Sequence, residues 1–301
     1  MQARLTAFIP DSAAITRSLS PGERLRIGRG GDCELLLAHP SISRMHAELV
    51  EDNRRWRLTD LRSKNGSFVE GAQVASTLLD SSCWLRFGDV HCEFAVLDSA
   101  AADADVRRWH ERHRAATAYT IQFDTIAHAG RSEAAPGQSL LDASLRAVTE
   151  LAGCSRGFLL IEEHGHYRVR AALALDPAQM VGHEFAGSLG TVTRAIEQRR
   201  AVVFNDIALD RGDTSASIVM GGLRTLVCLP LLDGDRVLGA IYADRREAGP
   251  PLTTLDLELL EAFADRAALW LSAHRASDDL AARSPAPLDW TSILAAPAMH
   301  I

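Results

Sequence analysis

The chain has 301 residues, 47% of them hydrophobic, which is enough for two domains of ordinary size with separate cores. Its 32 Lys+Arg against 39 Asp+Glu give a net charge of −7, which argues against a nucleic-acid binder that relies on a basic face. Residues 1–98 hold 12 basic and 13 acidic side chains, so this part is nearly neutral. Any anion site within it must therefore be a local cluster of cations.

The five cysteines form no C-x-x-C pair, and their odd number argues against a disulfide framework or a structural zinc site. The N-terminal segment is interrupted by Pro10 and Asp11, so we expect a strand and a turn there rather than a signal peptide. No stretch of about eighteen uncharged apolar residues occurs, so no membrane span is expected. Together these features predict a cytoplasmic protein.

Residues 1–98 are predicted to form an all-β sandwich. Apolar and polar residues alternate over short segments, as at 24–27, 47–50 and 55–59. Turn residues separate these segments, as at Pro21-Gly22 and Asn65-Gly66. Many short strands at near-regular spacing, with turns between them, are typical of a sandwich.

Three fragments of this part suggest one phosphate site assembled from three loops. They are Gly28-Arg29, Ser43-Arg44-Met45-His46 and Asn65-Gly66-Ser67, with strand-like segments between them. A guanidinium offers a fixed fork of donors that matches two oxygens of a phosphate. Any one fragment alone is better explained by a solvated surface charge or a hairpin turn. It is the ordered set that favours a site.

In this order the fragments resemble the forkhead-associated (FHA) family over about residues 4–97, supported by the flanking segments 26–29, 41–44, 58–61 and 87–88. The resemblance implies a sandwich whose loops bind phosphothreonine peptides, so the implied partner is a phosphorylated target of a Ser/Thr kinase. It implies the following roles: Arg29 pairs with the phosphate, Ser43 donates its hydroxyl, Arg44 and Lys64 flank the same oxygens, and Asn65 holds the peptide backbone.

The resemblance also implies structural support from Gly28, His46 and Gly66, with His46 bracing the loop that presents Ser43. The sequence departs from the family at Ser81-Ser82, where Gly-Asp is frequent, and at Ser67, where Thr is usual. The first departure affects a turn, and the second is a mild change.

Residues 99–136 are predicted to be a partly helical linker, and residues 281–301 a flexible tail. In the linker, His110, Glu111 and His113 invite a metal site, but a solvated helix face is the simpler interpretation. In the tail, Thr291 has a leucine three residues on. If it were phosphorylated, it could bind the N-terminal domain of another copy.

Residues 137–280 are predicted to form an α+β domain with a central antiparallel sheet. Apolar residues recur at helical spacing over 140–151, strands are expected at 157–161, 167–171 and 201–204, and a helix at 188–199. A hairpin over 226–242 turns at Asp233-Gly234-Asp235. A long helix then runs from about 255 to 280, with inward positions at Leu259, Leu260, Phe263, Ala267 and Trp270.

The segments 226–231 and 235–242, with the closing helix, resemble the GAF sensory family over about residues 137–275. The resemblance implies a six-stranded sheet that can hold a small ligand and a homodimer formed through the terminal helices. The ligand does not follow. Asp206 stands where the cyclic-nucleotide signature has Lys, and no Cys-His pair suggests a bilin. No cofactor is predicted, because His164 and His166 are expected in a turn facing solvent and Cys228 in a buried strand.

Signs of catalysis are weak. The segment 186–190 approaches G-x-S-x-G, but Ala186 replaces its first glycine and Ser188 is better explained as a helix N-cap. No P-loop, H-E-x-x-H or kinase signature occurs. We therefore expect a non-catalytic bacterial signalling adaptor whose second domain dimerises and can sense a small ligand. The alternatives are a dimeric scaffold that senses nothing and an enzyme with an unrecognised site in the second domain.

Overall fold

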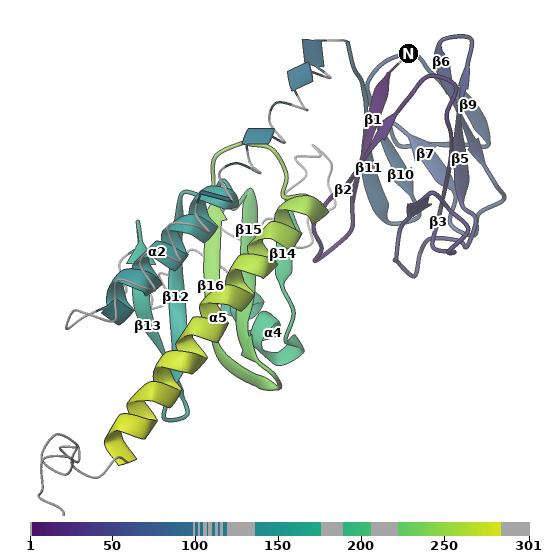
Figure 1. The fold of residues 1–301 in the computed structure, drawn as a ribbon. Coiled ribbons are helices and arrows are strands. Elements are labelled where there is room, and N and C mark those ends of the chain that lie inside the picture. Colours follow the sequence, from purple (N-terminus) through teal and green to yellow (C-terminus); the bar gives the residue numbers. More distant parts are fainter. Residues whose placement is uncertain are drawn as a thin grey trace, which may run out of the picture.

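The computed structural model describes residues 2–98, 136–175, 189–205 and 222–283, together with scattered positions between 100 and 118. Figure 1 shows an N-terminal body of strands and a C-terminal body in which helices cover a sheet. The predicted combination of an all-β sandwich and an α+β domain is confirmed.

Two sheets form the N-terminal sandwich. The six-stranded sheet has the order β2-β1-β11-β10-β7-β8, and the five-stranded sheet has the order β4-β3-β5-β6-β9. The strands are β1 (Ala3–Phe8), β2 (Ile15–Leu19), β3 (Arg24–Gly28), β4 (Leu35–Leu36), β5 (Ala47–Asp52), β6 (Arg55–Asp60), β7 (Ser67–Val69), β8 (Ala72–Val74), β9 (Ser76–Leu79), β10 (Cys83–Phe87) and β11 (Val90–Val96).

The alternation in the sequence decides which face of each strand enters the sandwich core. On β3, Leu25 and Ile27 are fully buried, while Arg24 and Arg26 point outward. Trp56 on β6 is the largest fully buried side chain, and each buried apolar side chain of this kind contributes about 1.5–3 kcal/mol. This core fixes where the strands end, and therefore where the loops meet.

The loops after β3, β4 and β6 meet at the end of the sandwich where β1 stops. Phe8, the last residue of β1, pairs with His91 beside the β10–β11 turn. In that turn, Gly88 donates a backbone hydrogen bond to the carbonyl oxygen of Gly66 at 3.1 Å. The β1–β2 turn and the three predicted site loops therefore share one end of the sandwich, the lower end in Figure 1.

The C-terminal unit is a five-stranded antiparallel sheet of order β13-β12-β16-β15-β14 in the described residues, where the GAF resemblance implies six strands. Helices α2 and α5 cover one face, and α4 packs against the other. The elements are α2 (Pro136–Leu151), β12 (Arg156–Glu163), β13 (His166–Leu173), α4 (Leu189–Gln198), β14 (Val202–Asn205), β15 (Thr225–Asp233), β16 (Arg236–Arg245) and α5 (Thr254–Arg283).

The inward face of α5 was predicted correctly in part. Leu260, Phe263 and Ala267 are buried in the core, and Trp270 packs against it while half-buried. The prediction was wrong for Leu259, which is half-buried and lies outside the core cluster. It lies on a different stripe of the helix together with Leu269, whose side chain is 71% exposed.

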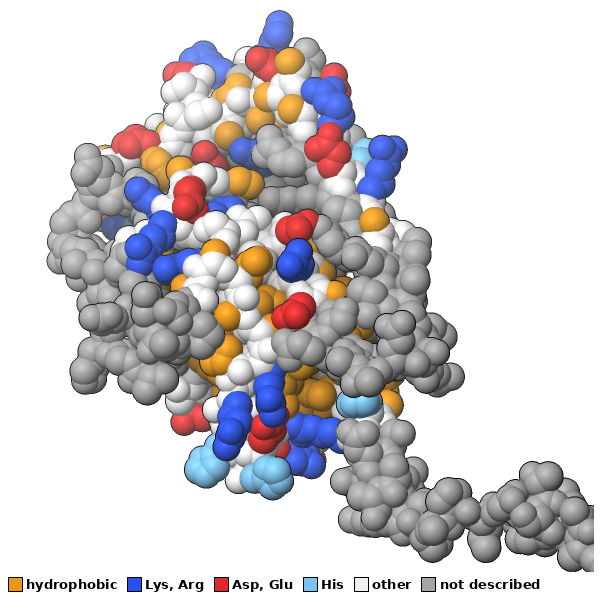
Figure 2. All heavy atoms as spheres, turned by 90° about the vertical axis from the view of Figure 1, so that its left-hand side faces the viewer, with side chains coloured by type: hydrophobic (Ala, Val, Ile, Leu, Met, Phe, Trp, Pro, Cys, Tyr) orange, Lys and Arg blue, Asp and Glu red, His pale blue; other side chains and the backbone are white. Residues whose placement is uncertain are grey.

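Two histidines of the C-terminal unit were expected to face solvent. His164 lies in the β12–β13 turn and His166 is the first residue of β13, and both are exposed. No described helix has the length and apolar character needed to cross a membrane. On the coloured part of the face in Figure 2, basic and acidic side chains are interspersed. The predictions for His113, Ala186, Ser188, Asp206 and Thr291 lie outside the described residues.

Candidate functional site

Backbone hydrogen bonds join the loop after β3 to the loop after β4. The N–H of Arg29 donates to the carbonyl oxygen of Ser43, and that of Gly30 donates to the carbonyl oxygen of Arg44, both at 3.0 Å. The N–H of His46 donates to the carbonyl oxygen of Ile27 at 2.9 Å. Backbone hydrogen bonds alone therefore hold the first two predicted fragments, Gly28-Arg29 and Ser43 to His46, next to each other.

Gly28 is required by this close approach. A Cβ atom at this position would lie 2.2 Å from the carbonyl oxygen of Arg44 and 2.7 Å from Sγ of Cys33. The Cys33 thiol donates a hydrogen bond to the same carbonyl at 3.2 Å, and burial raises the pKa of this thiol. The space beside Gly28 is therefore filled by backbone and by Cys33, and any side chain would push the two loops apart.

His46 connects the second loop to the third. The N–H of Ser43 donates to its Nδ1 at 3.1 Å, so Nδ1 carries no proton and Nε2 donates to the carbonyl oxygen of Gly66 at 3.1 Å. The ring is fully buried and forms a T-shaped contact with Phe87, with ring centroids 5.7 Å apart. Burial lowers the pKa of His46, although its bond to Gly66 opposes the shift. The geometry requires the neutral ring, since a proton on Nδ1 would leave the Ser43 N–H without an acceptor.

The third loop presents Lys64 and Asn65 beside Ser43. The N–H of Lys64 donates to Oγ of Ser43 at 3.0 Å, which leaves the Ser43 hydroxyl proton able to donate elsewhere. Nδ2 of Asn65 donates to the carbonyl oxygen of Ser41 at 2.8 Å. Both Lys64 and Asn65 are exposed. This bond uses one of the two N–H groups of the exposed Asn65 amide.

A hub of polar residues below the third loop was not predicted. Asp60 accepts hydrogen bonds from the N–H and hydroxyl of Ser63, at 2.9 and 2.7 Å, and from the hydroxyl of Ser67 at 2.6 Å. Burial pushes the pKa of Asp60 upward, but the bonds from Ser67 and Ser63 outweigh it and leave the pKa below its usual value. Ser63 in turn accepts from the N–H of Gly66 at 2.9 Å. The polar run Ser63 to Ser67 after Asp60 was the available signal.

The cations of the three loops lack acidic partners in the part of the chain that is described. On the neighbouring strand, Arg24 pairs with Glu48 and Arg26 with Glu34, each at 2.6 Å. The side chains of Arg29, Arg44 and Lys64 have no such carboxylate, and all three are exposed. Their positive charge is therefore available to an external anion.

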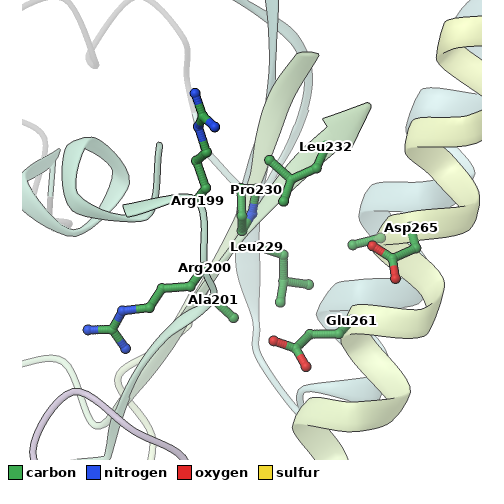
Figure 3. Close-up of a pocket in the computed structure, with 9 residues that line it drawn as sticks. Arg199, Arg200, Ala201, Leu229, Pro230, Leu232, Glu261 and Asp265 are labelled. Atoms are coloured by element: carbon green, nitrogen blue, oxygen red, sulfur yellow. The ribbon is translucent and has the colours of Figure 1, made fainter. Parts of the chain in front are cut away.

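The GAF-like unit has a separate hollow of about 230 Å³ between α5, β15 and the loop that joins α4 to β14. Figure 3 shows the carboxylates of Glu261 and Asp265 reaching from α5 toward β15, and the Arg199 and Arg200 side chains on the far side. Burial, followed by the charges of Asp265 and Glu258, raises the pKa of Glu261. The apolar floor comprises Ala201, Leu229, Pro230, Leu232 and Ala264.

The other face of the same sheet is packed with side chains. Phe158 and Tyr242 stack with ring centroids 4.9 Å apart, and the Tyr242 hydroxyl donates to Asp244 at 2.7 Å. Asp244 is fully buried and also pairs with Arg156. Burial raises the pKa of Cys228 on this face to about 12, so its thiol stays protonated, as an inert buried thiol was expected to be.

Family models match both parts of the chain. The FHA domain model matches residues 25–88, and the GAF domain model matches residues 136–271. The ABC transporter ATP-binding/permease protein Rv1747 of Mycobacterium tuberculosis is 37% identical over 81 residues, which are 27% of this chain and 9% of that protein. The FHA domain-containing protein FhaA of the same bacterium is 34% identical over 92 residues, 31% of this chain and 17% of that one. The chain therefore spans only a small part of these relatives.

Two solved structures of FHA domains each align with about a third of this chain. That of the CT664 protein from Chlamydia trachomatis aligns with 33% of this chain and 100% of its own, at a TM-score of 0.31 and 23% identity. The FHA-1 domain of Rv1747 from Mycobacterium tuberculosis covers the same shares at a TM-score of 0.28 and 26% identity.

Proposed function

Because the chain joins an FHA domain to a GAF domain, we propose that it is a signalling adaptor that binds phosphothreonine peptides. One observation supports the proposal: hydrogen bonds join the three loops that carry Ser43 and the cations Arg29, Arg44 and Lys64, and these cations have no acidic partner in the described residues. Arg29 supplies the fork for two phosphate oxygens, and Ser43 donates to a third. Arg44 and Lys64 add charge, and Asn65 holds the peptide backbone.

The strength of this site follows from its charges. A phosphorylated threonine carries about −1.5 to −2 charges and three strong acceptors. Each charge-assisted hydrogen bond contributes about 1.5–3 kcal/mol net, so a few of them, less the cost of ordering the peptide, give about −8 kcal/mol. That corresponds to micromolar affinity, the range suited to reversible recruitment of a partner.

Binding to a phosphothreonine peptide array, with unphosphorylated and phosphoserine versions beside it, tests the proposal. Arg29→Ala removes a two-pronged interaction of about 3 kcal/mol, so affinity for the selected peptide should fall about 100-fold. Arg24→Ala is the matched control, because Arg24 lies on the same part of the chain but is already paired with Glu48. Unchanged binding by Arg29→Ala, or equal binding of the unphosphorylated peptide, would contradict the proposal.

For the GAF domain we propose homodimerisation through α5. One stripe of this helix carries apolar residues at spacings of four, three and seven positions. They are Leu255, Leu259, Ala262 and Leu269. The exposed fractions of Leu255 and Leu269 are 38% and 71%, so part of an apolar stripe faces outward. A second α5 with the same stripe would bury both.

We also propose that the GAF domain senses a small ligand, with the domain as a plain dimeric scaffold as the alternative. Native mass spectrometry of freshly purified protein separates them, because only a sensor retains a bound small molecule. We propose no enzymatic reaction for the chain. The cytoplasm remains its proposed location, in keeping with five unpaired cysteines.

A further inference from the structure

The β1–β2 turn of the FHA domain reaches across to the GAF domain. It is a tight turn in which the N–H of Ser12 donates to the carbonyl oxygen of Ile9 at 3.2 Å. Pro10 precedes Asp11, whose φ of 57° places it in the left-handed region that the third residue of such a turn requires. The turn projects the Asp11 carboxylate to Arg194 on α4, with Nη1 to Oδ2 at 2.6 Å.

The residues after this turn are built into the GAF domain. Ala13 is 3% exposed and belongs to the core cluster that includes α2 and α5 of the GAF domain. Ala14 forms a parallel bridge with Thr253. Its N–H donates to the carbonyl oxygen of Leu252 at 2.8 Å, and its carbonyl oxygen accepts from the N–H of Thr254 at 2.9 Å. Thr254 is the first residue of α5, so the FHA domain satisfies one of the N–H groups that the helix itself cannot.

The GAF side of this contact is held in place. Asn205, the last residue of β14, donates to and accepts from the backbone of Leu252 at 3.0 and 2.8 Å. The buried Arg245 donates to the carbonyl oxygens of Gly153 and Pro250. Thr253 caps α5 through reciprocal bonds with Asp256. The 250–254 segment that receives Ala14 is therefore fixed to β14, to the end of α2 and to the start of α5.

We infer that residues Asp11 to Ala14 form a latch that couples the FHA domain to helices α4 and α5 of the GAF domain. The latch lies at the same end of the sandwich as the loops of the proposed phosphate site. The strand that leads into it, β1, pairs with β11, and the β10–β11 turn donates hydrogen bonds to Ser41 and Gly66. On the proposed function, a bound phosphopeptide thus lies at the same end of the sandwich from which the latch projects. Because coupling is reciprocal, a change in α4 or in the start of α5 must alter the latch, and release of the latch must alter α5.

Hydrogen exchange of the full chain, without any peptide, tests the latch directly. The Thr254 amide has its acceptor on the other domain, so Asp11→Arg combined with Ala13→Glu should raise exchange over 252–257 at least about tenfold. Asp11→Arg alone should raise the exchange rate over 252–257 by a smaller factor. Combining Asp11→Arg with Arg194→Asp should return this rate to the wild-type value. Asp11→Asn is the matched control for the turn, because Asn tolerates the left-handed conformation but lacks the charge. The double variant Asp11→Arg with Ala13→Glu is called the undocked variant below. Unchanged exchange over 252–257 in this variant would overturn the latch.

A second arm adds a phosphothreonine peptide selected on the array. Exchange over 252–257 should change on binding in the wild-type chain and stay constant in the undocked variant, while both bind the peptide within about twofold. An equal response in both chains, or none in either despite binding, would overturn the coupling. Failure of the peptide to bind would contradict the proposed function instead, and the peptide-free arm would still decide the latch.

Discussion

The N–H of Ser43 donates to Nδ1 of His46 at 3.1 Å, so the residue proposed to donate its hydroxyl to a phosphate is held by a buried neutral imidazole. The same ring binds the carbonyl oxygen of Gly66 through Nε2. One side chain therefore sets the distance between the second and third loops of the site, without facing the ligand itself.

This relationship predicts a loss of stability in mild acid. Burial holds the folded pKa of His46 below its unfolded value of about 6.5, so the folded state favours the neutral ring. The resulting stabilisation is complete above about pH 6.5 and is lost as pH falls toward the folded pKa. Calorimetric melting without peptide should therefore show the FHA domain losing stability as pH falls from about 7.5 to 5.5.

Two variants separate His46 from other titrating groups. His46→Gln should melt lower at neutral pH and lose most of the pH dependence, because nothing at that position titrates. His164→Gln, in an exposed turn, should keep the wild-type profile. An unchanged pH profile in His46→Gln would contradict the assignment. The melting is measured without peptide because a phosphate ester itself titrates near pH 6.

A second prediction concerns the contact between the first two loops. Gly28→Ala places a Cβ 2.2 Å from the Arg44 carbonyl oxygen, an overlap that backbone must relieve by moving. We expect a loss of about 1–3 kcal/mol in stability, typical of overpacking, and a larger fractional loss of phosphopeptide affinity because Arg29 and Arg44 separate. Gly31→Ala is the control, since no atom lies within 4 Å of its added Cβ and its cost should stay within about 0.5 kcal/mol. Equal behaviour of the two variants in denaturant titration and peptide binding would contradict this account.

The sequence predicted the fold and the set of loops because both depend on local patterns. Alternation specified the inner face of β3, and the order of three short fragments indicated loops that meet. The support below the third loop was missed because Asp60 was noted only as part of a flanking segment and Ser63 not at all. Both residues acquire their roles only when the loop folds back. The latch was missed for a similar reason. Pro10-Asp11 predicted a turn, but no local pattern says that Ala13 is buried in another domain.

The polar hub predicts a third effect. Asp60→Ala leaves the hydroxyls of Ser63 and Ser67 without their shared acceptor, and hydrogen bonds to a charged group contribute about 1.5–3 kcal/mol each. We expect a loss of about 3 kcal/mol in unfolding free energy, together with weaker phosphopeptide binding as Lys64 and Asn65 lose their support. Asp52→Ala provides the control, because its pair with Arg57 is 44% and 40% exposed and should contribute at most about 1 kcal/mol. Similar unfolding midpoints for the two variants would rule out the hub.

The exposed stripe of α5 predicts the assembly state. Leu269 is 71% exposed in one chain, so a dimer formed along the stripe would bury it, and Leu269→Glu would then bury an unpaired charge. We expect wild type to sediment as a dimer and Leu269→Glu as a monomer with an intact fold by circular dichroism. Leu36→Glu is the control, because Leu36 is 49% exposed on the FHA domain, away from the stripe. A wild-type monomer at high micromolar concentration, or a Leu269→Glu dimer, would show that α5 does not join two copies.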